Sequence, residues 1–252
     1  MILDGLDSND RIEKETRSLF EPLEKDFVVV AWDEPGTGKS YQAVPISTLT
    51  VDRFVEEAYA LTMYLRQRFH QDKIYVYGVS WSSIIGVKLV QQHSELFHAY
   101  IGNGQMVNTT ENDILGYELA LAYLDVLQEY MNMPRYTVIV PIIPFTASEY
   151  GYVDKINHTR GLIESFQVVY PQLKDLDFMT QAPTLEVPGY LFAGHNDVNA
   201  MHTIVEEYFN NLEAPHKVLT WLEGGHGLDG SNLGQFVDVM INQVKAETYP
   251  NK

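Results

Sequence analysis

The sequence contains no cysteine among its 252 residues. This absence excludes disulfide bonds, zinc sites with cysteine ligands and a thiol nucleophile. Basic residues are scarce as well, since 17 lysines and arginines face 34 aspartates and glutamates and leave a formal charge of −17. Because nucleic-acid binding requires a basic surface, we expect no nucleic-acid partner. An acidic, solvated surface is the simplest interpretation of this charge.

Long apolar runs are absent too. No stretch approaches the roughly 20 apolar residues that cross a bilayer, so we expect no membrane span. The N-terminus shows no signal-peptide pattern, which favours a cytoplasmic protein. The histidines show no metal-ligand spacing. Although His195 and His202 lie near Asp197, we predict neither a metal nor another cofactor, and the sequence indicates no oligomeric state.

The sequence does contain an alternation of strands and helices in its two outer parts. Apolar runs at residues 27–32, 74–79, 97–101, 187–193 and 217–222 predict buried strands. Helical patterns lie between most of them, for example over residues 50–69, where Asp52 is a candidate N-cap. Strands separated by helices predict βαβ units, and therefore a mostly parallel sheet flanked by helices.

The alternation stops between about residues 104 and 186. A long amphipathic helix is predicted over residues 111–130, followed by short aromatic-rich pieces around Tyr152 and Phe166. We therefore divide the chain into an α/β core, residues 1–107 and 186–252, and a helical cap, residues 108–185.

Ser80 lies between a predicted strand and a predicted helix, in the segment Gly78-Val79-Ser80-Trp81-Ser82. A serine in such a turn, two positions after a glycine, is the arrangement of a nucleophile elbow, G-x-S-x-G, although Ser82 replaces the last glycine. The turn lifts the hydroxyl to the N-terminus of the helix. There the backbone N–H groups and the positive helix end favour a developing oxyanion.

Asp197 and His226 each follow a later predicted strand, in the segments Gly194-His195-Asn196-Asp197 and Gly225-His226-Gly227. Catalytic groups of open α/β sheets lie at the carboxyl ends of the strands. The chain order Ser80, Asp197, His226, each just past a strand, is the order of α/β-hydrolase triads. Asp229 lies close to His226 in the sequence and is a rival for the orienting acid.

The glycine-rich loop at residues 35–40, Pro-Gly-Thr-Gly-Lys-Ser, offers an alternative interpretation as a phosphate-binding loop. That motif requires a glycine five positions before Gly38, where Asp33 stands. No helical pattern follows Lys39. We therefore expect no nucleotide here, and we expect the loop to lie beside the active site and to shape it.

These segments resemble the proline iminopeptidase-like family of α/β-hydrolases, peptidase family S33. Residues 32–40, Trp-Asp-Glu-Pro-Gly-Thr-Gly-Lys-Ser, are similar to the family's W-D-Q-R-G-x-G-x-S loop, and residues 78–82 to its G-G-S-W-G elbow. Residues 102–107 and the segments of Asp197 and His226 match further family motifs. The resemblance, from about residue 19 on, implies an α/β-hydrolase fold with a Ser80–His226–Asp197 triad. It also implies that the backbone N–H of Trp81 is an oxyanion donor.

The sequence departs from this family at its N-terminus. The family carries H-G-G-P-G after its third strand, and the corresponding residues 4–8 are Asp-Gly-Leu-Asp-Ser. We expect the N–H of Leu6 to be the second oxyanion donor. We also expect the family's N-terminal strands to be missing, because the chain starts where the third strand should lie. The altered loop leaves open a non-catalytic α/β-hydrolase-like binding protein.

The resemblance implies release of N-terminal residues, often proline, from small peptides. An aminopeptidase must hold a free amino terminus, for which carboxylates of the cap are candidates: Glu111, Glu118, Glu149 and Glu164. Hydrolysis of esters or amides with small acyl groups uses the same triad without this requirement and stays open as the alternative. The expected substrate is therefore a small peptide or ester.

Overall fold

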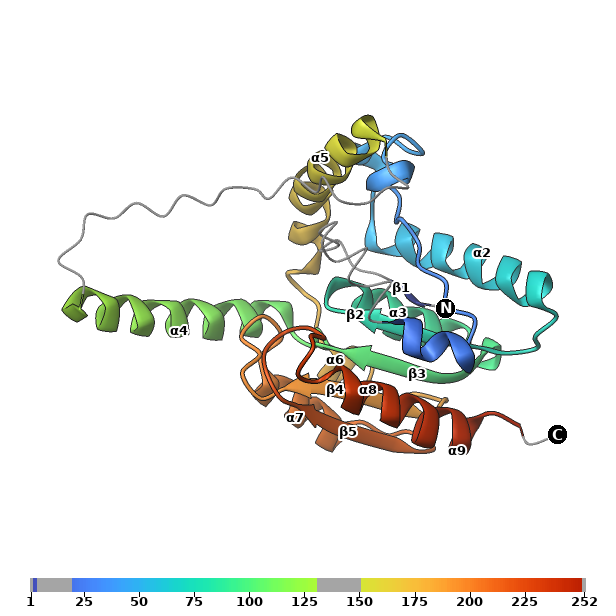
Figure 1. Ribbon diagram of the computed structural model, residues 1–252. Helices are drawn as coiled ribbons and strands as arrows, with labels where there is room; N and C mark the ends of the chain where they lie inside the picture. Colours follow the sequence, from blue (N-terminus) through green and yellow to red (C-terminus); the bar gives the residue numbers. More distant parts are fainter. Residues whose placement is uncertain (1, 4–19, 131–150, 251–252) are drawn as a thin grey trace.

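A parallel β-sheet lies at the centre of the protein (Figure 1). The computed structural model describes residues 2–3, 20–130 and 151–250. In this part of the chain the sheet has five strands in the order β1-β2-β3-β4-β5, and every neighbouring pair is parallel. The strands are β1 (Ile2–Leu3), β2 (Ile74–Val79), β3 (Phe97–Asn103), β4 (Gly189–Gly194) and β5 (Lys217–Leu222). The predicted parallel α/β core is confirmed.

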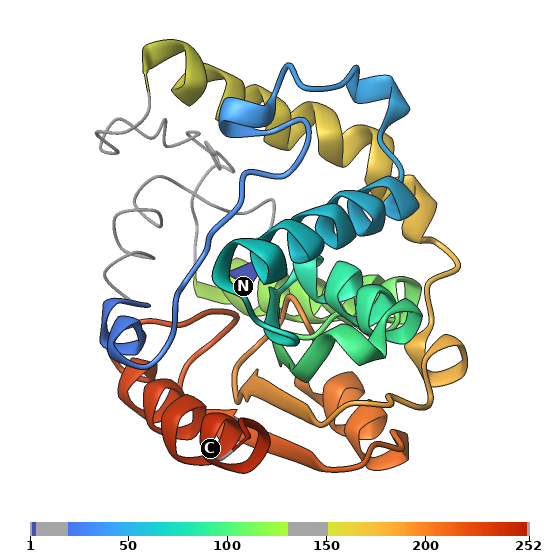
Figure 2. The same cartoon turned by 90° about the vertical axis from the view of Figure 1, so that its right-hand side faces the viewer.

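Helices cover both faces of the sheet (Figure 2). One apolar cluster holds side chains from α2 (Val51–Phe69), α3 (Trp81–Gln92), α6 (Phe178–Gln181) and α7 (His202–Asn211). The opposite cluster holds side chains from α8 (Leu233–Val239) and from the π-helical stretch Met240–Lys245 that leads into α9 (Ala246–Thr248).

Alternate residues of the strands point to opposite clusters, as a pleated strand requires. Tyr100 and Leu191 belong to the cluster of α2 and α3, whereas Ile101 and Tyr190 belong to the cluster of α8. All four side chains are at most 1% exposed. This double burial explains why the strands appear in the sequence as nearly continuous apolar runs.

Helix α2 begins one residue later than predicted, and its N-cap is Thr50 instead of Asp52. The hydroxyl of Thr50 accepts a hydrogen bond from the N–H of Arg53 at 3.1 Å. Asp52 lies within the first turn, where a carboxylate is favourable because it faces the positive helix end. The buried face of the helix includes Phe54 and Ala58, both with no exposed surface.

The predicted buried strand at residues 27–32 is wrong. In the part of the chain that the structure describes, this segment pairs with no strand, and Val28 is 61% exposed. Among the described residues, the first strand of the sheet, β1, comprises Ile2 and Leu3, which pair with Tyr77 and Gly78 of β2. Because backbone groups must find partners to form a strand, apolar composition alone does not create one here.

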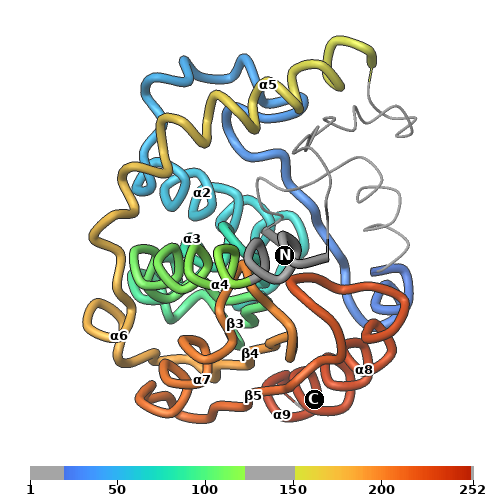
Figure 3. Tube along the Cα trace, turned by 90° about the vertical axis from the view of Figure 1, so that its left-hand side faces the viewer, coloured from blue at the N-terminus to red at the C-terminus, as the bar shows by residue number. Residues whose placement is uncertain are grey.

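Between β3 and β4 the chain leaves the sheet. Helix α4 (Thr109–Tyr130) runs away from the sheet, and α5 (Tyr152–Val169) packs against the loop of residues 33–48 (Figures 1 and 3). The short pieces expected around Tyr152 and Phe166 are in fact this one helix. Its periodicity is obscured because apolar residues such as Ile156 lie on the exposed side, while small and polar residues such as Ser165 face inward.

Candidate active site

Ser80 occupies a strained turn between β2 and α3. Its backbone has φ 51° and ψ −119°, a region that residues other than glycine rarely adopt. Gly78 makes the turn possible, because a Cβ there would lie 2.6 Å from the carbonyl oxygen of Ser82. The N–H of Ser80 donates to the carbonyl of Asn103 at 3.0 Å, which ties the turn to the end of β3.

The turn places Ser80 at the N-terminus of α3, directly before Trp81. The first N–H groups of a helix have no acceptor within it, so the N–H of Trp81 points out of the positive helix end. This is the environment predicted for one oxyanion donor. Leu6, the expected second donor, lies outside the described residues.

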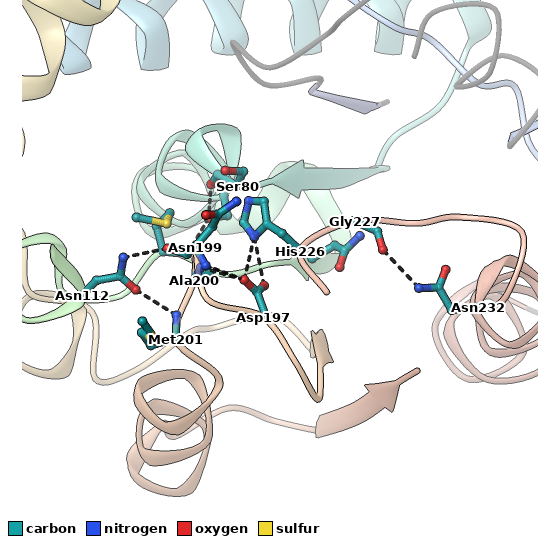
Figure 4. A network of polar contacts seen from close by, with 12 residues as sticks. Ser80, Asn112, Asp197, Asn199, Ala200, Met201, His226, Gly227 and Asn232 are labelled. Atoms are coloured by element: carbon teal, nitrogen blue, oxygen red, sulfur yellow. Dashed lines mark hydrogen bonds and ion pairs between the residues drawn. The ribbon is translucent and has the colours of Figure 1, made fainter. Parts of the chain in front are cut away.

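Asp197 follows β4 and is 1% exposed. Its Oδ1 accepts hydrogen bonds from the N–H groups of Asn199 and Ala200, both at 2.9 Å. The Nδ1 of His226 lies 2.9 Å from Oδ2 and 3.0 Å from Oδ1 (Figure 4). A carboxylate at Nδ1 favours the tautomer with its hydrogen on that atom, which leaves Nε2 as the basic nitrogen of the ring.

The Nε2 atom of His226 is buried and has no hydrogen-bond partner among the described residues. In Figure 4 the imidazole lies between Asp197 and Ser80. Ser80, Asp197 and His226 share one edge of the sheet because each follows the carboxyl end of a parallel strand. Hydrogen bonds between nucleophile and base often tighten only when substrate binds, so the open Nε2 is compatible with a catalytic base.

The loop that carries His226, residues 223–227, is packed tightly around this side chain. Gly104, at φ 57°, lies against the imidazole, since a Cβ there would come within 2.9 Å of the Cε1 atom of the ring. Asn232, which is 1% exposed, donates to the carbonyls of Glu223 at 2.9 Å and Gly227 at 3.1 Å, on either side of His226. The position of the ring is therefore fixed from both β3 and the start of α8.

Asn112 of α4 holds the loop that carries Asp197, residues 195–201, called the acid loop below. Its Oδ1 accepts from the N–H of Met201 at 2.8 Å, and its Nδ2 donates to the carbonyl of Asn199 at 2.6 Å (Figure 4). No sequence motif points to Asn112 or Asn232. Each is an amide residue in a helix or loop, and such residues are too common in a sequence to be singled out as functional.

Asp229, the alternative orienting acid, is hydrogen-bonded to Ser231 within its own turn. Its Oδ1 accepts from the N–H of Ser231 at 2.7 Å and from the Ser231 hydroxyl at 2.5 Å. These hydrogen bonds lower the pKa of the Asp229 carboxyl. Among the described ion pairs, His226 is paired with Asp197.

A cavity of about 120 Å³ lies beside Ser80. One wall comes from the core and the other from α5 and the turn after it, and the side chains are almost all apolar: Trp81, Ile84, Met106, Leu162, Phe166, Val169, Tyr170 and Leu173. The space is small and its lining is almost entirely apolar. It therefore suits a small apolar group.

The glutamates predicted to hold an amino terminus do not line this cavity in the part of the chain that the structure describes. Glu111 and Glu118 are exposed on α4, and Glu149 lies outside the described residues. Glu164 instead accepts hydrogen bonds from the Tyr41 hydroxyl at 2.6 Å and from Arg160 at 3.2 Å. The bonds from Tyr41 and then Arg160 lower the pKa of its carboxyl.

Asp113 is a carboxylate beside the cavity wall that the sequence analysis missed. Its Oδ1 accepts from the hydroxyl of Tyr170, one of the lining residues, at 2.5 Å. Burial and then this hydrogen bond raise the pKa of the Tyr170 hydroxyl. The spacing of α4 alone could not distinguish Asp113 from its acidic neighbours, because the choice depends on where Tyr170 lies.

The glycine-rich loop is closed on itself. The Oδ2 atom of Asp33 accepts from the N–H of Lys39 at 3.0 Å, and a Cβ at Gly38 would lie 2.7 Å from the same oxygen. Residues 38–40 form a 3₁₀ turn. An N–H group that a phosphate-binding loop would offer to its ligand is therefore bonded to the protein's own carboxylate.

The described residues contain neither a metal-binding cluster nor a membrane-spanning helix. No group of three or more histidines, aspartates or glutamates in this part of the chain is arranged to hold a metal ion. No helix there is both long and apolar enough to cross a bilayer.

Comparisons with known proteins add independent information. A model of the family described as serine aminopeptidase, S33, matches residues 17–228, a stretch that includes Ser80, Asp197 and His226. The probable aminopeptidase YbaC of Bacillus subtilis is 26% identical over 230 residues, covering 77% of this chain and 72% of the relative.

Solved structures share the fold. The proline iminopeptidase of Mycobacterium smegmatis has a TM-score of 0.68 and 15% identity, covering 97% of this chain and 88% of that one. The esterase EaEST of Exiguobacterium antarcticum has a TM-score of 0.62 and 16% identity, covering 97% and 90%. The expected α/β-hydrolase fold is therefore confirmed.

Proposed function

The chain belongs to the serine aminopeptidase S33 family of hydrolases, and on this premise we propose that it is a serine hydrolase with Ser80, His226 and Asp197 as its catalytic triad. One observation carries the proposal. His226 is held by Asp197 through Nδ1, and its buried Nε2 is hydrogen-bonded to none of the described residues while the ring lies between Asp197 and Ser80.

In this mechanism Ser80 attacks the carbonyl carbon of the substrate while Nε2 of His226 takes the hydroxyl proton. Asp197 stabilises the imidazolium, and the N–H of Trp81 donates to the oxyanion. The proton then passes to the leaving group and an acyl-enzyme forms. Water, deprotonated by His226, releases the acyl group and restores Ser80.

Residues 108–185 serve as the cap in this proposal. Support comes from α5 and the turn after it, which supply one wall of the cavity at Ser80 through Leu162, Phe166 and Leu173. A cap of this kind selects substrates by the size and polarity of the group that it encloses.

The preferred substrate is a short peptide with a small apolar N-terminal residue, such as proline. The S33 family match, the aminopeptidase relative and the size of the cavity favour this choice. The ammonium group of such a peptide needs a carboxylate close to the cavity. Asp113, bonded to the lining residue Tyr170, is the described candidate for this contact.

Hydrolysis of small acyl esters is the second candidate. The observation in its favour is that, among the described residues, none that lines the cavity carries a carboxylate, so the space accepts an uncharged acyl group without an ammonium. The same triad performs both reactions.

The test compares hydrolysis of proline p-nitroanilide and p-nitrophenyl butyrate by the wild-type protein and by Ser80→Ala. We expect both activities to fall to background in Ser80→Ala, with the anilide as the better substrate of the wild type. Labelling by a fluorophosphonate probe should likewise require Ser80. Well-folded wild-type protein that hydrolyses neither substrate and resists the probe would instead be a non-catalytic binding protein.

A further inference from the structure

Glu34 is a buried carboxylate beside the nucleophile turn that the mechanism above does not use. It lies in the loop after residues 27–32 and is 2% exposed. Its Oε2 accepts from the indole Nε1–H of Trp81 at 3.0 Å, and its Oε1 accepts from the hydroxyl of Ser82 at 3.2 Å. A carboxylate is rarely buried this deeply unless its hydrogen bonds stabilise a required arrangement.

The two partners of Glu34 are the two residues that follow Ser80. Trp81 begins α3 and supplies the proposed oxyanion N–H. Ser82 has no exposed surface and stands where the elbow motif has its last glycine. Glycine has no hydroxyl, so the bond from Ser82 to Glu34 exists only because of this replacement.

Both members of this contact differ from the family motifs that the sequence resembles. Glu34 stands where the W-D-Q-R-G loop has glutamine, and Ser82 where the G-G-S-W-G elbow has glycine. The two differences lie far apart in the sequence but are hydrogen-bonded in the structure. A carboxylate oxygen only accepts, and the serine hydroxyl gives it the hydrogen that glycine lacks.

The backbone of Glu34 is itself fixed. Its carbonyl accepts from the Thr37 hydroxyl at 2.9 Å and from the Thr37 N–H at 3.1 Å. The same loop carries Tyr41, whose hydroxyl donates to Glu164 of α5. Glu34 therefore connects the nucleophile turn to a loop that also supports one wall of the cavity.

We propose that Glu34 is a positioning residue of the nucleophile elbow. By holding the Trp81 indole and the Ser82 hydroxyl, its carboxylate fixes the start of α3, and with it the Trp81 N–H and the strained Ser80 backbone. The inference rests on the proposed serine hydrolase function. Glu34 does not line the cavity at Ser80, so it acts through Trp81 and Ser82 and not on the substrate.

Glutamine is the informative replacement at this position. In Glu34→Gln the amide oxygen still accepts from Trp81, while the amide NH₂ donates to the Ser82 hydroxyl oxygen. The geometry is kept and the charge is lost. Glu34→Ala removes both hydrogen bonds and leaves the indole N–H and the hydroxyl buried without partners.

The experiment measures kcat, KM and the rate of fluorophosphonate labelling for wild type, Glu34→Gln, Glu34→Ala and the exposed control Glu56→Ala. We expect Glu34→Ala to lower kcat and the labelling rate about tenfold or more with little change in KM, because the reacting groups shift. Glu34→Gln should recover most of this loss, and Glu56→Ala should match the wild type. Circular dichroism checks that each variant is folded.

Two further variants keep the test decisive if Glu34→Ala does not fold. Trp81→Phe removes the indole N–H and Ser82→Ala removes the hydroxyl, and each should lower the labelling rate. If these variants or folded Glu34→Ala kept the wild-type kcat, the inference alone would be overturned. Equal losses of kcat in Glu34→Gln and Glu34→Ala would also overturn it. Absence of Ser80-dependent labelling in the wild type would overturn the proposed function itself.

Discussion

Gly161 of α5 rests directly on the backbone of Gly36. A Cβ at Gly161 would lie 2.1 Å from the carbonyl oxygen of Gly36 and 3.0 Å from the Cα of Thr37. The helix reaches this distance only because residue 161 has no side chain. Since Leu162 and Phe166 of the same helix line the cavity at Ser80, this contact sets the distance between the cavity walls.

Gly161→Ala should therefore damage activity as well as stability. The added methyl group must push α5 away from the loop and move one wall of the cavity. We expect kcat/KM to fall at least about tenfold, because displacements near 1 Å have effects of this size or larger. We also expect destabilisation of about 1–3 kcal/mol from overpacking, measured by urea unfolding.

Gly234→Ala is the matched control for this change. Gly234 lies in α8, where a Cβ would meet nothing within 4 Å. The general cost of glycine in a helix predicts that alanine stabilises the protein here by roughly 0.5–1 kcal/mol. Activity should stay at the wild-type level. Equal effects of the two substitutions would contradict the role given to the Gly161 contact.

Asp197→Asn should abolish most of the activity while the protein stays folded. The amide no longer stabilises the imidazolium and favours the wrong tautomer of His226, for which a loss in kcat of about 10⁴ is typical. Asp229→Asn, in the neighbouring turn, should change kcat less than about threefold, because Asp229 is bonded to Ser231. If Asp229→Asn were the more damaging of the two, the assignment of the orienting acid would be wrong.

Asn112→Ala should loosen the acid loop. It removes the hydrogen bonds to Met201 and Asn199, and the buried N–H of Met201 loses its acceptor. We expect a loss of about 1–3 kcal/mol in the free energy of unfolding and a lower kcat. The exposed Asn242, which bonds Asp238 on the C-terminal helix, provides the comparison, and Asn242→Ala should leave kcat unaltered.

The stability of the α5 contact should depend on pH through Glu164. Hydrogen bonds from Tyr41 and Arg160 lower the pKa of its carboxyl in the folded protein. The unfolded chain then binds a proton more readily, so the contribution of Glu164 is present above its ordinary pKa of roughly 4.3 and is lost as the pH falls through the lowered value. Acid unfolding of the wild type should be steeper than that of Glu164→Gln. Glu118→Gln, at an exposed site, should behave as the wild type.

The sequence predicted the core because its strands are buried on both faces and its helices have clear apolar stripes. Ser80, Asp197 and His226 could be selected because each follows a strand, and parallel strands end at one edge. The strand expected at residues 27–32 did not form, because a strand needs a partner for its backbone groups and apolar composition carries no information about that partner.

Residues whose role depends on distant partners could not be predicted. Glu34 matters because Trp81 and Ser82 at the start of α3 come to it, and Asn112 because the acid loop lies against α4. Helix α5 was missed because it buries small and polar residues against a loop instead of an apolar stripe against the sheet. Such contacts arise from tertiary packing and leave no periodic pattern.

The backbone of Ser80, at φ 51° and ψ −119°, has a consequence for protein engineering. Glycine adopts this conformation without strain, whereas for a residue with a side chain it costs about 1–3 kcal/mol of folding free energy. Ser80→Gly should therefore melt at a higher temperature than the wild type while losing all hydrolysis. Selection for thermal tolerance alone would favour loss of the proposed nucleophile, so selection for stability in this protein needs an activity screen beside it.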